Sequence, residues 1–587
     1  MKLGKGFFAI LISIIIIVSN TLIVLLIPRN DDHSICGLPV QPCLYIKNYS
    51  RGYEDEWLLK LADRFEEEYK DVSFDDTLSK GVQVLIDTPE DDDDMDRHNI
   101  PGSRYHVYFT DDSDYYKLVN AEYLADITDI VTEDLGSFGE EGVTIEDKLS
   151  TQHKNFYKTN EKYYAIPHHS SYFGITYNVD VFDEYGFYFA ADPNVDASTT
   201  PYNTHLNNGN DGFISNKSDT KSNGPDGKPN TYDDGLPATY DEFFMLCDLI
   251  QGFSSKPIIW SGEKRNEYIQ MLLQALATDY EGAEQMMLNY SLNGTAKNLV
   301  KSIDENGKIE FNEPTTITNE NGYEMLKSAG RYYALDFFQR LSSNEKYYHS
   351  FSYNPNIKPS IAQQELLYTP FDVVPYPIAM LIDNSWWEDQ STDTANDISI
   401  FHGEEFSKKN RRFAMMPLPK ATKEQIGEPF TTFNSHNSIS FINANCSPIE
   451  MNMAKAFLQF ANTQESLVEF TLTTNTPKAL NYELTNDQIN EMTYFGKNLW
   501  RIKESGNVVY PLSTNKFFKD NQSALNYCNF FQADISDKTY NSVADDLRGT
   551  NASRVSAKDF FNGIIAKYDS TWWNDTFGSW FQNKENA

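Results

Sequence analysis

Short apolar runs alternate with helical patterns along most of this chain, and this alternation limits the folds that are open to it. Residues 43–47, 82–86 and 105–109 are apolar or β-branched runs of strand length. Between the first two, the segment Glu56–Tyr69 places its apolar residues on one face of a helix. A strand–helix–strand series of this kind predicts an α/β fold.

The same alternation continues to the C-terminus, with one long interruption. Residues 190–236 are rich in Asn, Asp, Ser, Gly and Pro and lack apolar periodicity, which is typical of a surface insertion. Further helices are predicted at Tyr240–Gln251, Asn266–Ala277, Gly322–Ser342, Ile449–Phe460, Ser466–Thr473 and Ala557–Tyr568. Because no composition change cuts the chain, we expect one interwoven α/β architecture rather than separate beads.

The charge balance narrows the choice of partner. The chain has 587 residues, with 49 Lys+Arg against 85 Asp+Glu, which gives a formal charge of −36. Nucleic acid needs clustered cations that neutralise phosphates, and anionic lipid surfaces need them too. The composition therefore argues against both as partners.

A long uncharged segment stands near the N-terminus. Phe7–Ile27 is dominated by Ile, Leu and Val, and as a helix it would span roughly 30 Å, the thickness of a bilayer core. Lys2 and Lys5 precede it and Asp31 follows it, so the positive-inside rule places the remainder of the chain outside the cytoplasm. Residues 1–29 are predicted to be a membrane anchor or a signal.

Two alternatives to a retained anchor stay open. A cleaved signal would show a small-residue cleavage site, and no A-x-A-like site follows Ile27. A lipidated protein would need a small-residue box before its acylated cysteine, and Cys36 follows His33, Ser34 and Ile35. In every case we expect residues from about 30 onward at the extracellular face of the membrane or secreted from it.

Several segments, in order, carry a resemblance to a known family. They are Val107–Tyr116 (VYFTDDSDYY), Tyr163–Tyr177 (YYAIPHHSSYFGITY), Leu236–Phe243 (LPATYDEF), Met380–Trp387 (MLIDNSWW), Ala414–Pro419 (AMMPLP) and Ala454–Phe460. Together they resemble the extracellular solute-binding proteins of bacterial ABC importers, in the carbohydrate-binding group (family 1, maltose-binding-protein-like). The resemblance runs from about Cys43 to the C-terminus.

The resemblance implies a periplasmic-binding-protein-like fold of type II, with two α/β lobes and three hinge crossovers. The N-terminal lobe would hold residues 43–167 and 438–500, and the C-terminal lobe residues 170–432 and 503–587. It further implies that a carbohydrate, expected to be an oligosaccharide, is captured between the lobes and delivered to the permease subunits of an ABC importer without chemistry. Closure of the lobes would signal to the permease.

A sugar site needs planar aromatics for C–H faces and fixed polar groups for hydroxyls. By position in the matching motifs, the predicted ligand-binding residues are Arg51, Asp111, Asp112, His169, Tyr172, Trp260, Glu263, Asn384, Trp386 and Trp387. Structural alternatives stay open for six of them: core or lobe packing for the tryptophans, helix capping for the two aspartates and a surface ion pair for Arg51.

The insertion carries a separate signal. Residues 223–237 (NGPDGKPNTYDDGLP) place Asp226, Asn230, Asp233 and Asp234 among glycine turns. Calcium prefers several oxygen ligands on a sharply bent loop, so these four residues are candidate calcium ligands. The spacing is not that of an EF-hand, and an acidic turn without metal is the alternative. No cofactor is expected to be required.

Other functions remain as alternatives. A binding protein for a peptide or another polar solute would share the fold, and a secreted glycoside hydrolase would need two carboxylates about 5–10 Å apart. With 85 acidic residues the sequence gives no reason to choose such a pair. No G-x-S-x-G, HExxH, P-loop or G-x-G-x-x-G motif stands out, so we expect a binding protein rather than an enzyme.

Overall fold

A computed structural model describes the chain from residue 41 to residue 583, with gaps. The described residues are 41–49, 52–74, 80–89, 95, 97–111, 115–371, 377–521, 524–525, 542–548 and 555–583. The predicted anchor or signal, residues 1–29, lies outside them, as do Arg51 and Asp112. Within the described ranges, no helix is both long and apolar enough to cross a membrane.

The first sheet has five strands in the order β2-β1-β3-β16-β6. β1 (Cys43–Tyr49) pairs in parallel with β2 (Gln83–Asp87) and with β3 (Val107–Thr110). β16 (Ile439–Ile442) comes from much later in the chain and runs antiparallel to β3 and to β6 (Ile166–Pro167). The first sheet is therefore completed only after the chain has formed the second sheet, between β6 and β16.

Helices cover this sheet and bury their apolar faces against it. α2 (Glu56–Glu68) buries Trp57, Leu58, Leu61, Ala62 and Phe65, the face that the sequence predicts. α15 (Pro448–Ala461) begins with a capping box between Ser447 and Glu450, with proline in its first turn. α16 (Gln464–Thr474) follows it and packs against α2. Smaller helices on this lobe are α3 (Tyr115–Asn120), α4 (Thr128–Thr132), α5 (Ile145–Lys148), α6 (Thr151–Tyr157) and α17 (Asn486–Glu491).

The second sheet has four strands in the order β14-β7-β13-β8. β7 (Phe173–Asn178) and β13 (Ile378–Asn384) lie at its centre and are antiparallel. β8 (Lys256–Ile259) is parallel to β13, and β14 (Phe413–Met415) is antiparallel to β7. Every residue of the two central strands is buried, as expected of a sheet covered on both faces.

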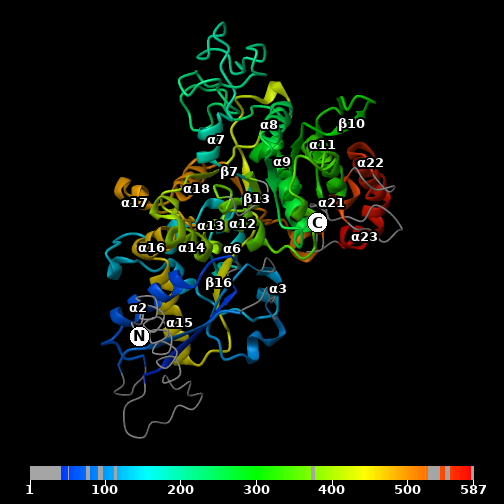
Figure 1. Ribbon diagram of the computed structural model, residues 1–587. Helices are drawn as coiled ribbons and strands as arrows, with labels where there is room; N and C mark the ends of the chain where they lie inside the picture. Colours follow the sequence, from blue (N-terminus) through cyan, green and yellow to red (C-terminus); the bar gives the residue numbers. More distant parts are fainter. Residues whose placement is uncertain are drawn as a thin grey trace, which may run out of the picture.

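The second lobe is the larger of the two in helical content. Its helices include α7 (Val179–Tyr185), α8 (Tyr240–Gly252), α9 (Arg265–Met286), α10 (Leu288–Ser291), α11 (Ala329–Ser342), α12 (Pro359–Leu367), α13 (Trp387–Gln390), α14 (Thr392–His402), α18 (Tyr494–Glu504), α19 (Lys516–Asp520), α21 (Val543–Asp546), α22 (Ala557–Lys567) and α23 (Ser570–Gln582). Two short hairpin-like pairs, β10 (Val300–Ile303) with β11 (Ile309–Phe311) and β9 (Gly294–Ala296) with β12 (Thr315–Ile317), lie outside the main sheet. Figure 1 shows the two lobes one above the other, with β16 in the lower and β7 and β13 in the upper.

The chain passes between the lobes three times, and the three passages are joined by backbone pairing. The first runs from β6 to β7, the second from β14 to β16, and the third from α16 to α18. β15 (Thr432–Phe433) on the second passage pairs with β17 (Val508–Val509), which follows α18. Tyr172 on the first bridges Asn434 on the second, and His169 bridges Lys478. The α/β prediction is confirmed, and the topology has the three crossings that the resemblance implied.

Two large hydrophobic cores correspond to the two lobes. One gathers around β1, β3, β16 and α2, and the other around β7, β13, α9 and α11. α18 contributes to more than one cluster: Trp500 packs in the first core, whereas Phe495, Leu499 and Ile502 pack in a smaller cluster with Trp387 of the second lobe. The sequence-based boundary at residue 500 thus falls inside a helix that contacts both sides.

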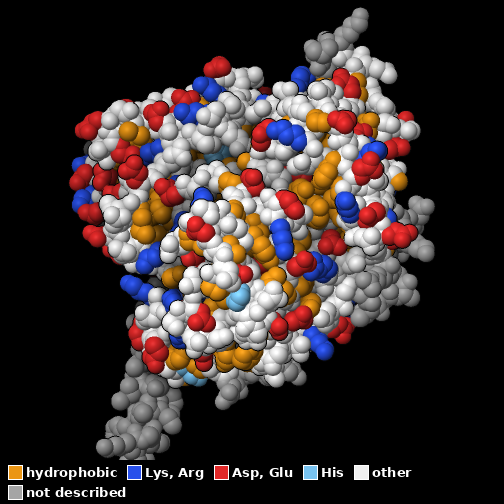
Figure 2. Space-filling view, turned by 90° about the horizontal axis from the view of Figure 1, so that it is seen from above, with side chains coloured by type: hydrophobic (Ala, Val, Ile, Leu, Met, Phe, Trp, Pro, Cys, Tyr) orange, Lys and Arg blue, Asp and Glu red, His pale blue; other side chains and the backbone are white. Residues whose placement is uncertain are grey.

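The insertion between α7 and α8 contains no helix or strand, and all of its residues are described. Isolated bridges such as Phe189–Phe213 and Ala190–Lys221 hold it together. In Figure 1 it stands beyond α7, at the end of the second lobe away from the first. Figure 2 shows acidic side chains spread over the face in view, with no continuous basic patch among them.

Candidate functional site

The ends of strands from both sheets meet at the three crossings. Asp111 follows β3 of the first lobe, and Trp386 follows β13 of the second. His169 lies on the first crossing and His436 on the second. Ligands of open α/β sheets bind beyond strand ends, so this junction is the natural place to look for a site.

Trp386 is the aromatic centre of the junction. It is 8 % exposed, and its ring lies 4.8 Å from that of His436, 6.0 Å from that of Tyr53 and 6.2 Å from that of His169, measured between centroids. Tyr53 belongs to the first lobe, so the indole is enclosed by residues of both lobes and of the crossings. The ring is therefore almost fully covered in this arrangement of the lobes.

Beside the indole stands a buried polar pair. His169 Nε2 and Asp111 Oδ1 are 2.9 Å apart, and their side chains are 0 % and 7 % exposed. The other ring nitrogen of His169, Nδ1, has no hydrogen-bond partner among the described residues. A buried polar atom left without a partner costs free energy, which a ligand hydroxyl or a water molecule can offset.

A second histidine lies behind this pair. Lys478 Nζ is 2.6 Å from His168 Nδ1 and stands over the rings of Phe470 and Trp57 at 4.2 and 5.2 Å. Burial lowers the pKa of Lys478 well below its ordinary value. Burial, with Lys478 nearby, lowers the pKa of His168 in the same direction. Both shifts favour the uncharged forms of these two side chains, which form a polar wall behind the site.

The second lobe contributes a fixed amide. Asn384 Nδ2 donates to Ser435 Oγ at 2.7 Å, and its backbone N–H donates to Asp383 Oδ1 at 2.7 Å. Asp383 also accepts from Gln363 Nε2 at 3.0 Å, and burial raises the pKa of its carboxyl to about 6. These bonds hold the end of β13 rigidly below Trp386.

The structure thus brings Asp111, His169, Asn384 and Trp386 together, and does not bring the other described candidates into the same cluster. Trp387 packs against Phe413 and Phe495 inside the second lobe. Trp260 is buried among Phe338, Tyr348 and Tyr353. Glu263 is exposed in the loop between β8 and α9.

Tyr172 lies on the first crossing, where its backbone is bonded to the second lobe. Its backbone exchanges two hydrogen bonds with Ser385, at 3.0 Å to the hydroxyl and 2.7 Å from the N–H, and its side chain is fully buried. Tyr172 therefore ties the crossing to the turn that carries Trp386.

Sequence reasoning missed Tyr53, His436 and Lys478. Each lies in irregular backbone, where no apolar period marks it. The only available signal for Tyr53 was its place directly before the first predicted helix, Glu56–Tyr69.

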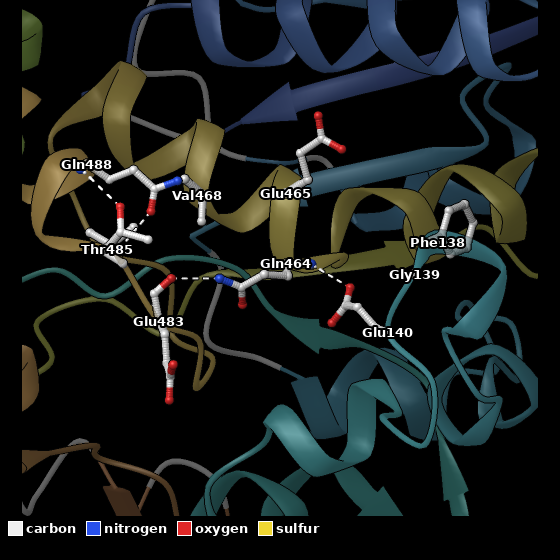
Figure 3. A pocket seen from close by; sticks show the side chains of 10 residues that line it. Phe138, Gly139, Glu140, Gln464, Glu465, Val468, Glu483, Thr485 and Gln488 are labelled. Carbon is white, nitrogen blue, oxygen red and sulfur yellow. Dashed lines mark hydrogen bonds between the residues drawn. The ribbon is translucent and has the colours of Figure 1, made fainter.

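A pocket of about 570 Å³ lies elsewhere, on the first lobe (Figure 3). Its polar groups are largely satisfied by one another. Gln464 donates from its backbone N–H to Glu140 and from its side chain to the carbonyl of Glu483, each at 2.6 Å. Thr485 and Gln488 form a capping box for α17. Because these groups already have partners, we do not place the functional site here.

In the insertion, the predicted calcium loop is held by hydrogen bonds. The Thr231 hydroxyl lies 2.6 Å from Asp233 Oδ1 and 3.2 Å from Asp234 Oδ1, and Asn230 N–H donates to Asp234 Oδ2. Asp226 N–H donates to Asp233 Oδ2. The described residues contain no group of three or more His, Cys, Asp or Glu side chains placed to hold a metal ion. Calcium binding stays a prediction; added calcium that leaves the melting temperature unchanged would remove it.

Among the solved structures similar to this chain are several that are described as binding proteins. A chitin oligosaccharide binding protein matches with 14% identity over 91% of this chain and 98% of its own, at a TM-score of 0.49. The binding protein RafE in complex with raffinose matches with 13% identity over 90% and 98%, at 0.47. A putative binding protein, MsmE of Bacillus subtilis, in an open conformation, matches with 13% identity over 92% and 99%, also at 0.47.

No protein-family model and no curated protein matches the chain. The sheet orders and the three crossings define a two-lobed α/β protein with its candidate site between the lobes.

Proposed function

We propose that this protein is the extracellular solute-binding component of an ABC importer, which captures a carbohydrate between its two lobes. The observation that carries the proposal is the enclosure of Trp386 by groups of both lobes and of the crossings, next to the buried His169–Asp111 pair. Capture needs no bond to be made or broken; it needs only that the ligand favour the closed arrangement of the lobes.

The chemistry of the junction suits a sugar. The indole of Trp386 offers a flat apolar face for C–H groups, and the neighbouring Tyr53 ring stands at 70° to it. Asp111, His169 and Asn384 supply acceptors and donors held in place by the strand ends and crossings. An aromatic face with a few fixed polar groups is the usual composition of such a site.

Delivery to a permease and tethering to the membrane belong to the same proposal. The sequence of Phe7–Ile27 supports the tether, since it has the length and apolar character of a membrane span. A tether would keep the captured ligand near the permease. Washed membranes that retain the full-length protein, but release a variant lacking residues 1–29, would support this part.

Calorimetry tests the binding function. The chain from residue 41 onward is titrated with raffinose, chitin oligosaccharides and short peptides, and each mixture is then examined for cleavage products. We expect saturable binding of at least one saccharide and no turnover. Binding of peptides alone would show that the ligand is a peptide and not a carbohydrate. Cleavage of a saccharide would show that the protein is a glycoside hydrolase and not a binding protein.

A further inference from the structure

Among the contacts between the two lobes, one lies beside the candidate site. On the first lobe it is formed by Gly52–Glu54, which precede α2. On the second it is formed by Trp386, the N-cap of α13, and by Asp389 within α13. The backbone of Gly52 lies so close to the indole that a Cβ at this position would be 2.2 Å from Trp386 Cδ1. The contact therefore depends on the absence of a side chain at residue 52.

The same contact contains a hydrogen bond between the lobes. Glu54 N–H donates to Asp389 Oδ2 at 3.1 Å. Asp389 is only 6 % exposed, and Lys408 Nζ approaches its other oxygen at 3.3 Å. The carboxylate is thus held by its own lobe and directed at the backbone of the other.

The N-terminus of α2 lacks a capping side chain of its own. Its N-cap residue, Asp55, makes no side-chain capping bond, because its Oδ1 accepts from Asn48 Nδ2 at 3.1 Å and from Thr88 Oγ1 at 2.7 Å. A helix N-terminus favours negative charge. Asp389 brings that charge from the second lobe.

We propose that Asp389 is a positioning residue for ligand capture: it latches the second lobe onto the start of α2 and so fixes the closed arrangement in which Trp386 is covered. This inference rests on the proposed function for its biological meaning. The latch itself is a property of the unliganded chain.

The latch is balanced rather than permanent. Burial, and then the nearby carboxylates of Asp389 and Asp393, raise the pKa of Glu54. These carboxylates face one another across the lobe boundary and repel, which offsets part of the attraction at the backbone. A contact of this kind can open and close.

The first test removes the carboxylate. Asp389→Ala is compared with Asp393→Ala, which removes the same charge from the same boundary without a hydrogen bond to the first lobe. Small-angle X-ray scattering on unliganded protein should give a larger radius of gyration for Asp389→Ala, and a wild-type radius for Asp393→Ala. The dissociation constant of the saccharide should rise about tenfold for Asp389→Ala, the size expected for one charged hydrogen bond.

The second test acts from the other lobe and leaves Asp389 intact. Gly52→Ala drives a methyl group into the indole, and its backbone φ of +77° adds local strain. Gly139→Ala is its control, since Gly139 has a φ of +83° and open space where a Cβ would stand. We expect the larger radius for Gly52→Ala alone.

Melting curves identify any variant that has lost its fold. The radius of gyration is compared only among the variants that fold. Wild-type radii for both folded Asp389→Ala and folded Gly52→Ala would overturn the latch. Because the radius is measured without sugar, this outcome is separate from a failure of the wild-type protein to bind any saccharide, which would overturn the proposed function instead.

Discussion

Trp386 and Trp387 are neighbours in sequence and occupy opposite kinds of environment. Trp386 lies between the lobes, where His436 and Tyr53 approach its ring. Trp387 begins α13 and is 0 % exposed, packed against Phe413 and Phe495 within the second lobe. One ring can be uncovered by a movement of the lobes, and the other cannot be reached without unfolding part of its own lobe.

The difference shows how the proposed binding turn is built. The core tryptophan anchors the turn to the second lobe, and the anchored turn presents its neighbour to the gap between lobes. Substitutions at the two positions should therefore separate stability from binding.

The largest effect is expected for Trp387→Ala. Truncating a fully buried tryptophan leaves a cavity and should reduce the free energy of unfolding by about 3–5 kcal/mol. Chemical denaturation of the variant and the wild type measures it. A loss below about 1 kcal/mol would contradict the anchoring role.

The second effect is expected for Trp386→Ala, and it concerns binding. Loss of the stacking surface should weaken saccharide affinity by about 10- to 100-fold, while the free energy of unfolding falls by less than for Trp387→Ala. Trp580→Ala serves as the control, since Trp580 lies on α23 and bonds Asp520, far from the junction in sequence. Equal affinity of Trp386→Ala and wild type would remove the indole from the site.

The smallest effect concerns the strand end below these residues. Burial raises the folded-state pKa of Asp383 to about 6, above the ordinary value of an aspartate carboxyl. The folded protein therefore holds this proton more readily than the unfolded chain does, so Asp383 makes stability fall as the pH rises from about 4 through about 6. In Asp383→Asn this part of the decline should be absent.

The measurement is the melting temperature of both proteins between pH 4 and pH 7. Other buried acids with raised pKa values, such as Glu388 and Glu281, remain in both proteins, so the comparison depends on the difference in slope. Parallel curves would show that burial of Asp383 is not coupled to pH in this range.

Local patterns in the sequence were sufficient for many elements. The helix expected at Glu56–Tyr69 is α2 (Glu56–Glu68), and that at Tyr240–Gln251 is α8 (Tyr240–Gly252). Their apolar spacing and their start signals are contained in the segments themselves. The helix expected at Asn266–Ala277 is longer, because α9 continues through a kink at Gly282 to Met286.

The site was predictable only where a strand end marked it. Asp111 and Trp386 follow buried strands, a position that sequence can indicate. Whether a tryptophan at such a position faces the junction or the core depends on distant residues: Phe338 and Tyr348 enclose Trp260, and they come from segments about 80 to 90 residues later in the chain. Tyr53 was missed because its partner, Trp386, comes more than 300 residues later in the chain.

The late arrival of β16 has a consequence for how the protein is made. β3 pairs with β1 on one side and with β16 on the other, and synthesis must pass through residues 111–438 before that second partner exists. During this interval one edge of β3 presents unpaired backbone groups, the kind of edge that recruits other chains. The first lobe is begun first and completed late, so a nascent chain of this protein depends on whatever shields that edge until its C-terminal third has emerged.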